Sequence, residues 1–254
     1  MSEEVIKRVN RALSHIWRFV TEVKDDIGKI SLRDLIDEGG INPYMVAALS
    51  ITNVEDVAKL FIYKRVERSL TTKFGNAIEA FLRDLLGGVK GEKHYGCTTK
   101  KLKWICWWDI VIDKEFEEGG KKYRGIVIAV RSGPADIDKD VAEKFVDHIK
   151  EAEKNGYRPY IVFTYGKKVF GVADTTLRNY GLDPKRYLLI GREFYKQFLN
   201  DENVYEYIIN AITETFKDVQ INLINLIEDK VKRIAEDLKR RYGSDVSKLL
   251  KEVT

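Results

Sequence analysis

Acidic and basic residues border two apolar stretches in the middle of the chain. Asp109 precedes the run 110–112, and Arg131 follows the run 125–130. Both runs are rich in β-branched residues, which predicts strands, and a polar turn containing glycine joins them. Because paired strands bring their ends together, the acid and the base can meet at one end of a sheet. That is the arrangement that metal-dependent cleavage of a phosphodiester needs.

The spacing of the apolar residues changes from helical to extended along this region, and it predicts the helices and strands that position these residues. Residues 73–86 have helical spacing and end at Gly87-Gly88, with Glu79 beside the apolar stripe. We then expect strands at 94–98, 104–112 and 123–130, a helix capped by Asp136 or Asp138 and reaching 155–156, and a strand at 158–165. This order predicts an α/β fold with a mixed β-sheet flanked by helices.

The flanking regions are predicted to be mainly helical. A helical N-terminal region, 1–70, contains expected helices at 3–25, 31–37, from 42–43 onward, and 54–68, and Thr71 or Thr72 would cap the next helix. The region 71–200 would be the sheet-containing core, with a hairpin turn at 166–167, strands at 169–173 and 188–190, and a helix at 192–199. The C-terminal region, 201–254, carries one long helical pattern over 204–242, which predicts either a break near Asp218 or a partner helix from a second chain.

Composition narrows the class of protein. The chain of 254 residues has 44 basic and 40 acidic residues and a net charge of +4, which favours local basic patches over a basic tail. No apolar run reaches the roughly 18 residues of a membrane span, and the acidic N-terminus lacks a hydrophobic signal region, so we expect a cytoplasmic protein. Many Lys, Glu and Ile with few Met, His and Cys are typical of a thermophilic source.

Two cysteines and a nearby histidine offer a second kind of site. His94, Cys97 and Cys106 lie close together in the sequence, but their spacing matches no zinc pattern. We therefore expect two buried, reduced thiols on neighbouring strands. The three tryptophans at 104, 107 and 108 indicate core packing, with base stacking as the alternative.

The order of elements, with an acid on one strand and a base closing the next, resembles the PD-(D/E)XK nuclease superfamily. More narrowly, the chain resembles the type II restriction endonucleases of that superfamily. The resemblance covers roughly residues 42–200 and is carried by the segments 42–44, 69–79, 108–112 and 131–140. The last segment begins Arg131-Ser132-Gly133-Pro134, where the family commonly has Lys-Ser-Gly-Pro.

The resemblance implies Mg²⁺-dependent hydrolysis of double-stranded DNA at a short sequence. Asp109 would be the strand acid that binds the metal, and Glu79 resembles the accessory carboxylate that many members bring to the same site. Arg131 stands in the place of the family lysine, and Ala129 in that of the second acid. Carboxylates that hold Mg²⁺ offset the charge of the transition state, and a neighbouring cation adds to this.

Two of these positions depart from the family pattern. Ala129 cannot bind a metal, and Arg131 stays cationic, so it can stabilise charge but cannot act as a base. Asp113 is a candidate for the missing carboxylate, although a straight strand would place it ~13 Å from Asp109 unless a bulge shortens the path. Lys139, near the start of the following helix, is a candidate for the missing lysine.

Basic and hydroxyl-bearing residues near these segments are candidates for contacts to the DNA backbone or bases. The alternative for each is an ordinary solvated surface or capping residue. The candidates are Arg68, Thr71, Thr72, Lys73, Asn76, Lys100, Lys101, Lys103, Ser132 and Lys139.

The sequence therefore predicts a site-specific DNA endonuclease of restriction type. A palindromic site calls for two catalytic centres related by two-fold symmetry, so we expect a homodimer, with a cognate DNA methyltransferase encoded nearby. The alternatives are a nuclease-fold protein that binds DNA with weak or no cleavage, a DNA repair or junction nuclease, and a structural α/β protein with no role on DNA.

Overall fold

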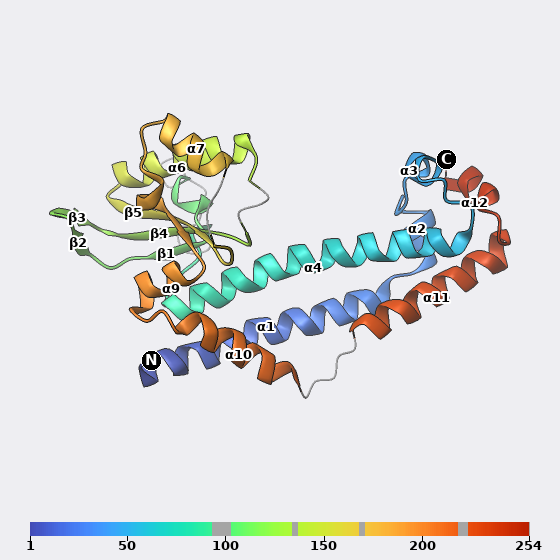
Figure 1. Ribbon diagram of the computed structural model, residues 1–254, viewed down its shortest axis with the longest axis horizontal. Helices are drawn as coiled ribbons and strands as arrows, with labels where there is room; N and C mark the ends of the chain where they lie inside the picture. Colours follow the sequence, from blue (N-terminus) through green and yellow to red (C-terminus); the bar gives the residue numbers. More distant parts are fainter. Residues whose placement is uncertain (93–102, 134–136, 168–170, 218–222, 254) are drawn as a thin grey trace. The chain divides into compact units, whose positions relative to one another are not determined.

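The computed structural model describes residues 1–92, 103–133, 137–167, 171–217 and 223–253 (Figure 1). The chain forms two compact units. One consists of Met1–Ile16 and Gly75–Thr215, and the other of Trp17–Phe74 and Phe216–Thr254. Each unit therefore combines segments that are far apart in the sequence. The three regions 1–70, 71–200 and 201–254 divide the chain in another way and stay a prediction.

Helices surround a small number of short strands. The helices are α1 (Glu3–Lys29), α2 (Leu32–Ile36), α3 (Pro43–Ala48), α4 (Val54–Leu86), the 3-10 helix η1 (Ile105–Trp107), α6 (Lys139–Lys154), α7 (Val172–Asn179), α8 (Pro184–Tyr187), α9 (Arg192–Leu199), α10 (Val204–Lys217), α11 (Leu223–Tyr242) and α12 (Val246–Val253). The strands are β1 (Ile110–Ile112), β2 (Phe116–Glu118), β3 (Lys121–Tyr123), β4 (Gly125–Arg131), β5 (Tyr157–Phe163) and β6 (Leu188–Ile190).

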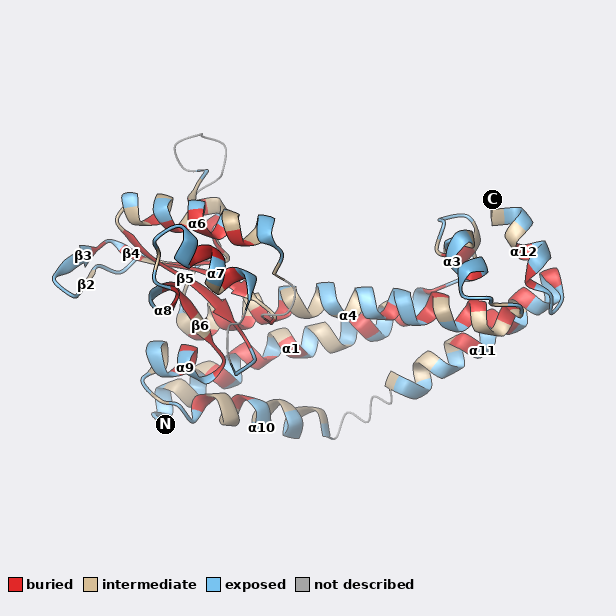
Figure 2. Ribbon diagram, turned by 45° about the horizontal axis from the view of Figure 1, so that its top comes forward, coloured by how far each residue is buried: buried red, intermediate tan, exposed pale blue. Residues whose placement is uncertain are grey.

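The first unit contains a mixed four-stranded sheet in the order β1-β4-β5-β6. β1 is antiparallel to β4, whereas β4, β5 and β6 run parallel. Strands β4 and β5 are buried along almost their whole length because both faces of the sheet are covered, and Figure 2 shows β5 buried throughout. The expected mixed sheet flanked by helices is confirmed.

Helices pack on both sides of this sheet. α6 and α7 lie on one side, and α9 with the C-terminal part of α4 lies on the other (Figure 1). On the α6 side, Phe145 and Ile149 share a core with Val127 and Ile161 of the sheet. The N-cap of α6 is Asp138, whose side chain accepts a hydrogen bond from the Val141 amide at 2.8 Å, so the second of the two predicted caps begins this helix.

A separate two-stranded ribbon fills the connection between β1 and β4. β2 and β3 pair around Gly119 and Gly120, which have φ of 59° and 76°. Positive φ at both central residues is the geometry of a tight hairpin turn, which glycine adopts without a steric penalty. The ribbon is tied to the main sheet by an ion pair of 2.7 Å between Glu118 and Arg158.

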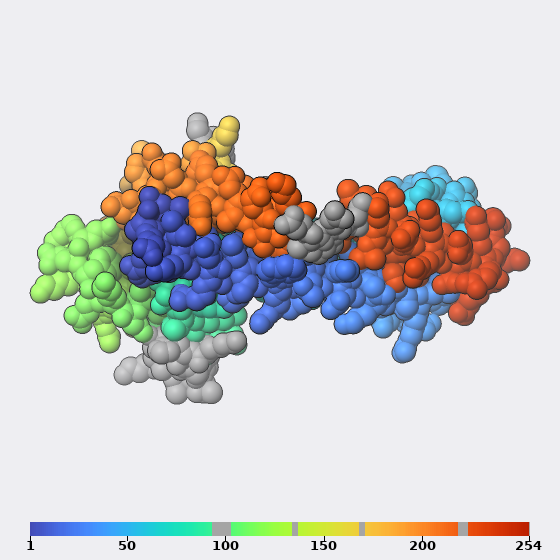
Figure 3. All heavy atoms as spheres, turned by 90° about the horizontal axis from the view of Figure 1, so that it is seen from below, coloured from blue at the N-terminus to red at the C-terminus, as the bar shows by residue number. Residues whose placement is uncertain are grey.

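The second unit is an assembly of helices around its own apolar core. Val23 and Ile27 of α1, Phe61 of α4, and Ile234 and Leu238 of α11 are all buried in it. Figure 3 shows part of this packing, with the red residues of α11 and α12 against the blue residues of the α1 segment. In α11, buried residues recur at positions 231, 234, 235, 238 and 242, which is the spacing of one helix face.

One boundary inside the helical region was predicted wrongly. The sequence indicated a helix over 54–68 and a new start at Thr71 or Thr72, but α4 runs without a break from Val54 to Leu86. Hydroxyl-bearing and β-branched residues cost a helix only a few tenths of a kcal/mol each, so Ser69-Leu70-Thr71-Thr72 does not terminate it. Thr71 is not a cap, and its hydroxyl donates to Glu67 one turn earlier at 3.1 Å.

Two predicted strands were also wrong. Of the segment 104–112, only Ile110–Ile112 form a strand. Ile105–Trp107 form a 3-10 turn, in which Trp107 packs against Phe145 of α6. The expected hairpin partner at 169–173 is absent from its described part, since Val172 and Ala173 begin α7 and the neighbours of β5 are β4 and β6. The predicted strand at 94–98 lies outside the described residues.

Three smaller expectations can be compared with the structure. Cys106 is disulfide-bonded, so the reduced thiol expected there is wrong, and Cys97 lies outside the described residues. α10 is described to Lys217 and α11 from Leu223, so the expected break near Asp218 falls outside the described residues. Within the described ranges, no helix has both the length and the apolar composition needed to cross a bilayer.

Candidate active site

Asp109 lies at the start of β1, where the pairing with β4 changes. The Ile128 carbonyl accepts a hydrogen bond from the Asp109 amide at 3.0 Å, although Ile128 is already the register partner of Ile110. Asp109, which precedes β1, and Ile110, its first residue, therefore both oppose Ile128 of β4, as in a β-bulge. The bulge directs the Asp109 carboxylate along the sheet, where it accepts the Val130 amide hydrogen bond at 2.8 Å.

Arg131 is held beside this carboxylate by several contacts. Its Nη1 lies 3.4 Å from Asp109 Oδ2 and donates to the Val130 carbonyl at 2.6 Å. The guanidinium also lies over the rings of Trp107 and Phe145, with 5.5 Å to each centroid. These contacts hold the Arg131 guanidinium beside the Asp109 carboxylate. The geometry agrees with the prediction that strand pairing brings the two residues together.

Glu79, on the C-terminal part of α4, is the second carboxylate of the site. Among the described residues its side chain has no hydrogen-bond or ion-pair partner. Burial raises the pKa of Glu79, and the charge of Asp109 raises it further, against the opposing effects of Lys90, Arg131 and Arg83. Burial also raises the pKa of Asp109, against the Val130 hydrogen bond and the charges of Arg131, Lys90 and Arg83. Two partly buried carboxylates thus share one region, and their ionisation is disfavoured in the free protein.

Lys90 is a residue of this site that the sequence reasoning missed. It follows Val89, which forms an antiparallel bridge with Val111 on the edge of β1 that faces away from β4. No motif points to Lys90, because its place depends on a pairing between a single residue and a three-residue strand. The only available signal was the short stretch after Gly87-Gly88, which returns the chain from α4 to the sheet.

The donors at this site suit a small, hard divalent cation. Asp109 and Glu79 offer carboxylate oxygens, and the Glu79 carboxylate is partly buried without a partner in the described structure. Mg²⁺ commonly takes one or two protein carboxylates and keeps several waters, so two acids are enough. No cluster of three or more His, Cys, Asp or Glu suited to a metal occurs among the described residues, so a larger all-protein cage is not available there.

The two positions that were expected to complete the acid set lie elsewhere. Ala129 is fully buried in the core between the sheet and α6, where it has no metal-binding group. Asp113 is at the opposite end of β1 from Asp109 and accepts a hydrogen bond from the Tyr157 hydroxyl at 2.7 Å. The structure therefore brings Asp109, Glu79 and Arg131 together and does not bring Asp113 to them. Lys139 is exposed on the first turn of α6 and lies 3.8 Å from Glu143.

The candidate DNA contacts are distributed over both units. Arg68, Thr71, Thr72 and Lys73 lie on the part of α4 that belongs to the helical unit, and Asn76 lies on the part that belongs to the sheet-containing unit. Lys73 forms ion pairs with Glu22 and Asp26 at 3.4 and 3.3 Å. Lys103 is exposed, and the Ser132 carbonyl accepts a hydrogen bond from Thr164. Lys100 and Lys101 lie outside the described residues, and the DNA contacts stay a prediction.

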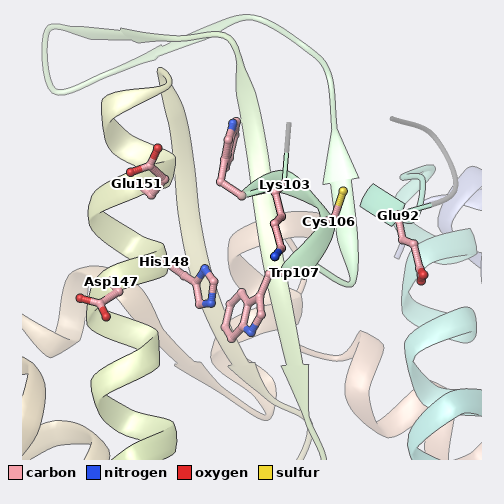
Figure 4. Close-up of a pocket in the computed structure, with 8 residues that line it drawn as sticks. Glu92, Lys103, Cys106, Trp107, Asp147, His148 and Glu151 are labelled. Carbon is pink, nitrogen blue, oxygen red and sulfur yellow. The ribbon is translucent and has the colours of Figure 1, made fainter. Parts of the chain in front are cut away.

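A cavity of about 700 Å³ lies next to the Arg131 contact network. Trp107 lines it and stacks on His148 of α6, with the ring centroids 3.9 Å apart (Figure 4). Burial lowers the pKa of His148, and the charge of Arg131 acts in the same direction. The three tryptophans thus pack in or against the apolar core, as the sequence indicated for the cluster, and Trp107 also supports Arg131.

The bulged start of the β1–β4 pairing holds Asp109, with Glu79 of α4 and the Arg131 guanidinium near it, and these groups suit the binding of a divalent cation and a phosphate. The class is that of the restriction-type nucleases, whose mixed sheet and acidic edge the chain shares. The sequence model of one family, described as type II restriction endonuclease EcoO109I, matches residues 3–220, and the chain belongs to this family. It is thus a type II restriction endonuclease, an enzyme class that hydrolyses DNA at specific sites. No curated protein matches the chain.

Proposed function

We propose that this restriction endonuclease requires Mg²⁺ and that Asp109 and Glu79 hold the ion. The observation that carries the proposal is the Glu79 carboxylate, which is partly buried beside Asp109 and has no hydrogen-bond or ion-pair partner among the described residues. An unpaired buried carboxylate is costly unless a cation binds it. When bound, Mg²⁺ supplies charge neutralisation at the phosphate and lowers the pKa of a coordinated water.

The residues around the two acids have separable roles. Asp109 is aimed by the bulge and by the Val130 amide, so its carboxylate needs little reorganisation to bind an ion. Arg131 cannot lose its proton at any relevant pH and therefore contributes fixed positive charge beside Asp109. The Trp107 and Phe145 rings hold the guanidinium in place and shield it from water. Together these residues preorganise charge where the phosphate would bind.

The proposed substrate is double-stranded DNA with a two-fold symmetric recognition sequence. We propose that two copies of the chain act together as a homodimer, because a symmetric site presents two equivalent scissile bonds. A cognate methyltransferase encoded nearby would protect the host DNA, and the proposed place of action is the cytoplasm. Sedimentation of the purified protein with and without a DNA duplex tests the dimer, and a mass of one chain under both conditions contradicts it.

Cleavage of a phage-sized DNA tests the proposal directly. The purified protein is incubated with this DNA and Mg²⁺ at several temperatures, beside an Asp109→Ala variant and a sample in EDTA. We expect discrete fragments from the unmodified protein and none from the other two. A smear of random fragments contradicts site specificity, and undiminished cutting in EDTA contradicts the metal requirement. DNA binding without any cutting contradicts the proposed catalysis.

A further inference from the structure

A second cation approaches the Asp109 end of β1 from the edge that β4 leaves open. Val89 and Val111 exchange two backbone hydrogen bonds of 2.9 and 2.8 Å, and the Gly91 amide donates to the Trp108 carbonyl at 3.4 Å. These bonds lie on either side of Lys90. In antiparallel pairing, the bridge at Val89 and Val111 places Lys90 opposite Ile110, the residue after Asp109.

The backbone around Lys90 has little freedom to move away. A Cβ on Gly91 would lie 2.1 Å from the Ile105 carbonyl oxygen and 3.2 Å from that of Trp108. Only glycine therefore permits this close approach of the segment to η1 and β1. Lys90 is consequently fixed at its main chain on one side by the Val111 pairing and on the other by the packing of Gly91.

The side chains of Arg131 and Lys90 differ in the number and strength of their contacts. Arg131 is bonded to the Val130 carbonyl and to Asp109, and it is stacked on two rings. Lys90 has a side chain that is 33% exposed and forms a long ion pair of 3.8 Å with Glu92, which is itself 66% exposed. A contact of this kind is weak in water. Lys90 can therefore exchange it for a more highly charged partner at small cost.

The pKa values of the two carboxylates agree with a position of Lys90 at the Asp109 end of β1. The charge of Lys90 lowers the pKa of both Glu79 and Asp109, against the effect of burial on each. Lys90 therefore contributes positive charge that acts on both carboxylates. The same charge would act on a phosphate bound beside the two acids.

Building on the proposed function, we propose that Lys90 contacts the scissile phosphate and the attacking water, and so supplies the lysine that is absent where Arg131 stands. Hydrolysis forms a bond from the water oxygen to phosphorus and breaks the bond from phosphorus to one sugar oxygen. One water proton ends on the leaving sugar oxygen, and the other is lost from the new phosphate monoester to solvent. An ammonium group with three rotatable donors can hold the water and the phosphate oxygen together.

The experiment compares Lys90→Met with Lys114→Met in single-turnover cleavage of a duplex with Mg²⁺. Lys114 is an exposed lysine just beyond the opposite end of β1, so it controls for the loss of one positive charge. We expect the cleavage rate of Lys90→Met to fall by about 100-fold, the usual effect of removing one preorganised donor, with the Lys114→Met rate unchanged. Circular dichroism melting of each variant checks that it folds.

The outcomes separate this proposal from the proposed function. If the unmodified protein cuts DNA and Lys90→Met cuts within threefold of its rate, the role of Lys90 is overturned while the metal-dependent nuclease stands. If the unmodified protein does not cut, the salt dependence of DNA binding in Ca²⁺ still tests the phosphate contact. The slope of log affinity against log salt should then be smaller by about one for Lys90→Met than for Lys114→Met. Equal slopes overturn the contact.

Discussion

The two ends of β1 each carry an aspartate, and the two residues have different surroundings. Asp109 lies at a bulge beside Arg131, and its carboxyl pKa is raised by burial. Asp113, four residues later, is exposed and accepts a hydrogen bond from the Tyr157 hydroxyl. The neighbours that come from other elements, and not the residue type, make one aspartate suitable for metal binding and the other a structural partner.

Neutralising each aspartate in turn tests whether the two residues have different roles in cleavage. We expect Asp109→Asn to lower the rate of DNA cleavage by about 1,000-fold, because a metal ligand accounts for several kcal/mol of transition-state stabilisation. Asp113→Asn should cleave within about threefold of the unmodified protein. The measurement is single-turnover cleavage at saturating Mg²⁺. An equal loss in the two variants would show that both ends of β1 take part.

Glu79→Gln tests whether the second carboxylate belongs to the Asp109 end. We expect cleavage to fall by about 100-fold, which corresponds to ~3 kcal/mol of lost stabilisation. The pKa of Glu79 is raised above its ordinary value in the fold, so its ionisation destabilises the fold as pH rises through and above that value. Glutamine removes this penalty.

The same substitution therefore has a readout besides activity. In thermal melts at neutral pH without metal, Glu79→Gln should melt no lower than the unmodified protein, and added Mg²⁺ should raise its melting temperature less. Glu22→Gln, at an acid that pairs with Lys73 in the helical unit, is the matched control and should keep the full Mg²⁺ response. A clear drop in the metal-free melting temperature of Glu79→Gln contradicts the picture of an uncompensated carboxylate.

The pH dependence of Mg²⁺ binding tests whether the pKa values of Asp109 and Glu79 are raised. Protons compete with the metal for Asp109 and Glu79, whose pKa values are raised above 3.8 and 4.5 by burial. When the solution is acidified, Mg²⁺ affinity should therefore begin to weaken at a higher pH than it would for two carboxylates with ordinary pKa values. Isothermal titration of Mg²⁺ at several pH values measures this, and an affinity that falls only where ordinary carboxylates take up protons argues against the two raised pKa values.

The smallest expected effect is at the Asp113 end. Tyr157→Phe removes the hydroxyl that donates to Asp113 but keeps the ring, so it should lower the free energy of unfolding by about 1 kcal/mol. Cleavage should be unchanged within about twofold. Urea unfolding and a cleavage assay measure the two quantities, and a large loss of cleavage in a stably folded variant would indicate that this end communicates with the site.

Much of the fold could be predicted from hydrophobic period alone. The runs that form β4 and β5, and the spacing that forms α6, are strong signals because both faces of the sheet and one face of the helix are buried. The continuous helix through Thr71 and Thr72 was missed because tertiary packing on α4 outweighs weak local preferences. The segment that forms η1 resembles a strand in the sequence, because three tryptophans stand in an apolar run.

The candidate site was only partly visible in the sequence. The two apolar runs predict paired strands that bring Asp109 and Arg131 together. The resemblance to a nuclease family predicts Glu79 as a second carboxylate of the site. Lys90 depends on a single antiparallel bridge, Val89 to Val111, that no local pattern encodes. The bulge that turns Asp109 toward the Val130 amide likewise arises from a mismatch between two strands, which neither strand shows by itself.

The ribbon formed by β2 and β3 makes the number of residues between Asp109 and Arg131 independent of the chemistry they share. Both residues are fixed by the pairing of β1 with β4, whereas the ribbon has its own turn at Gly119-Gly120 and its own pairing. Evolution can lengthen or shorten such an insertion without displacing the acid or the cation. A search for relatives that assumes a constant gap between these two positions would therefore overlook enzymes that carry the same site.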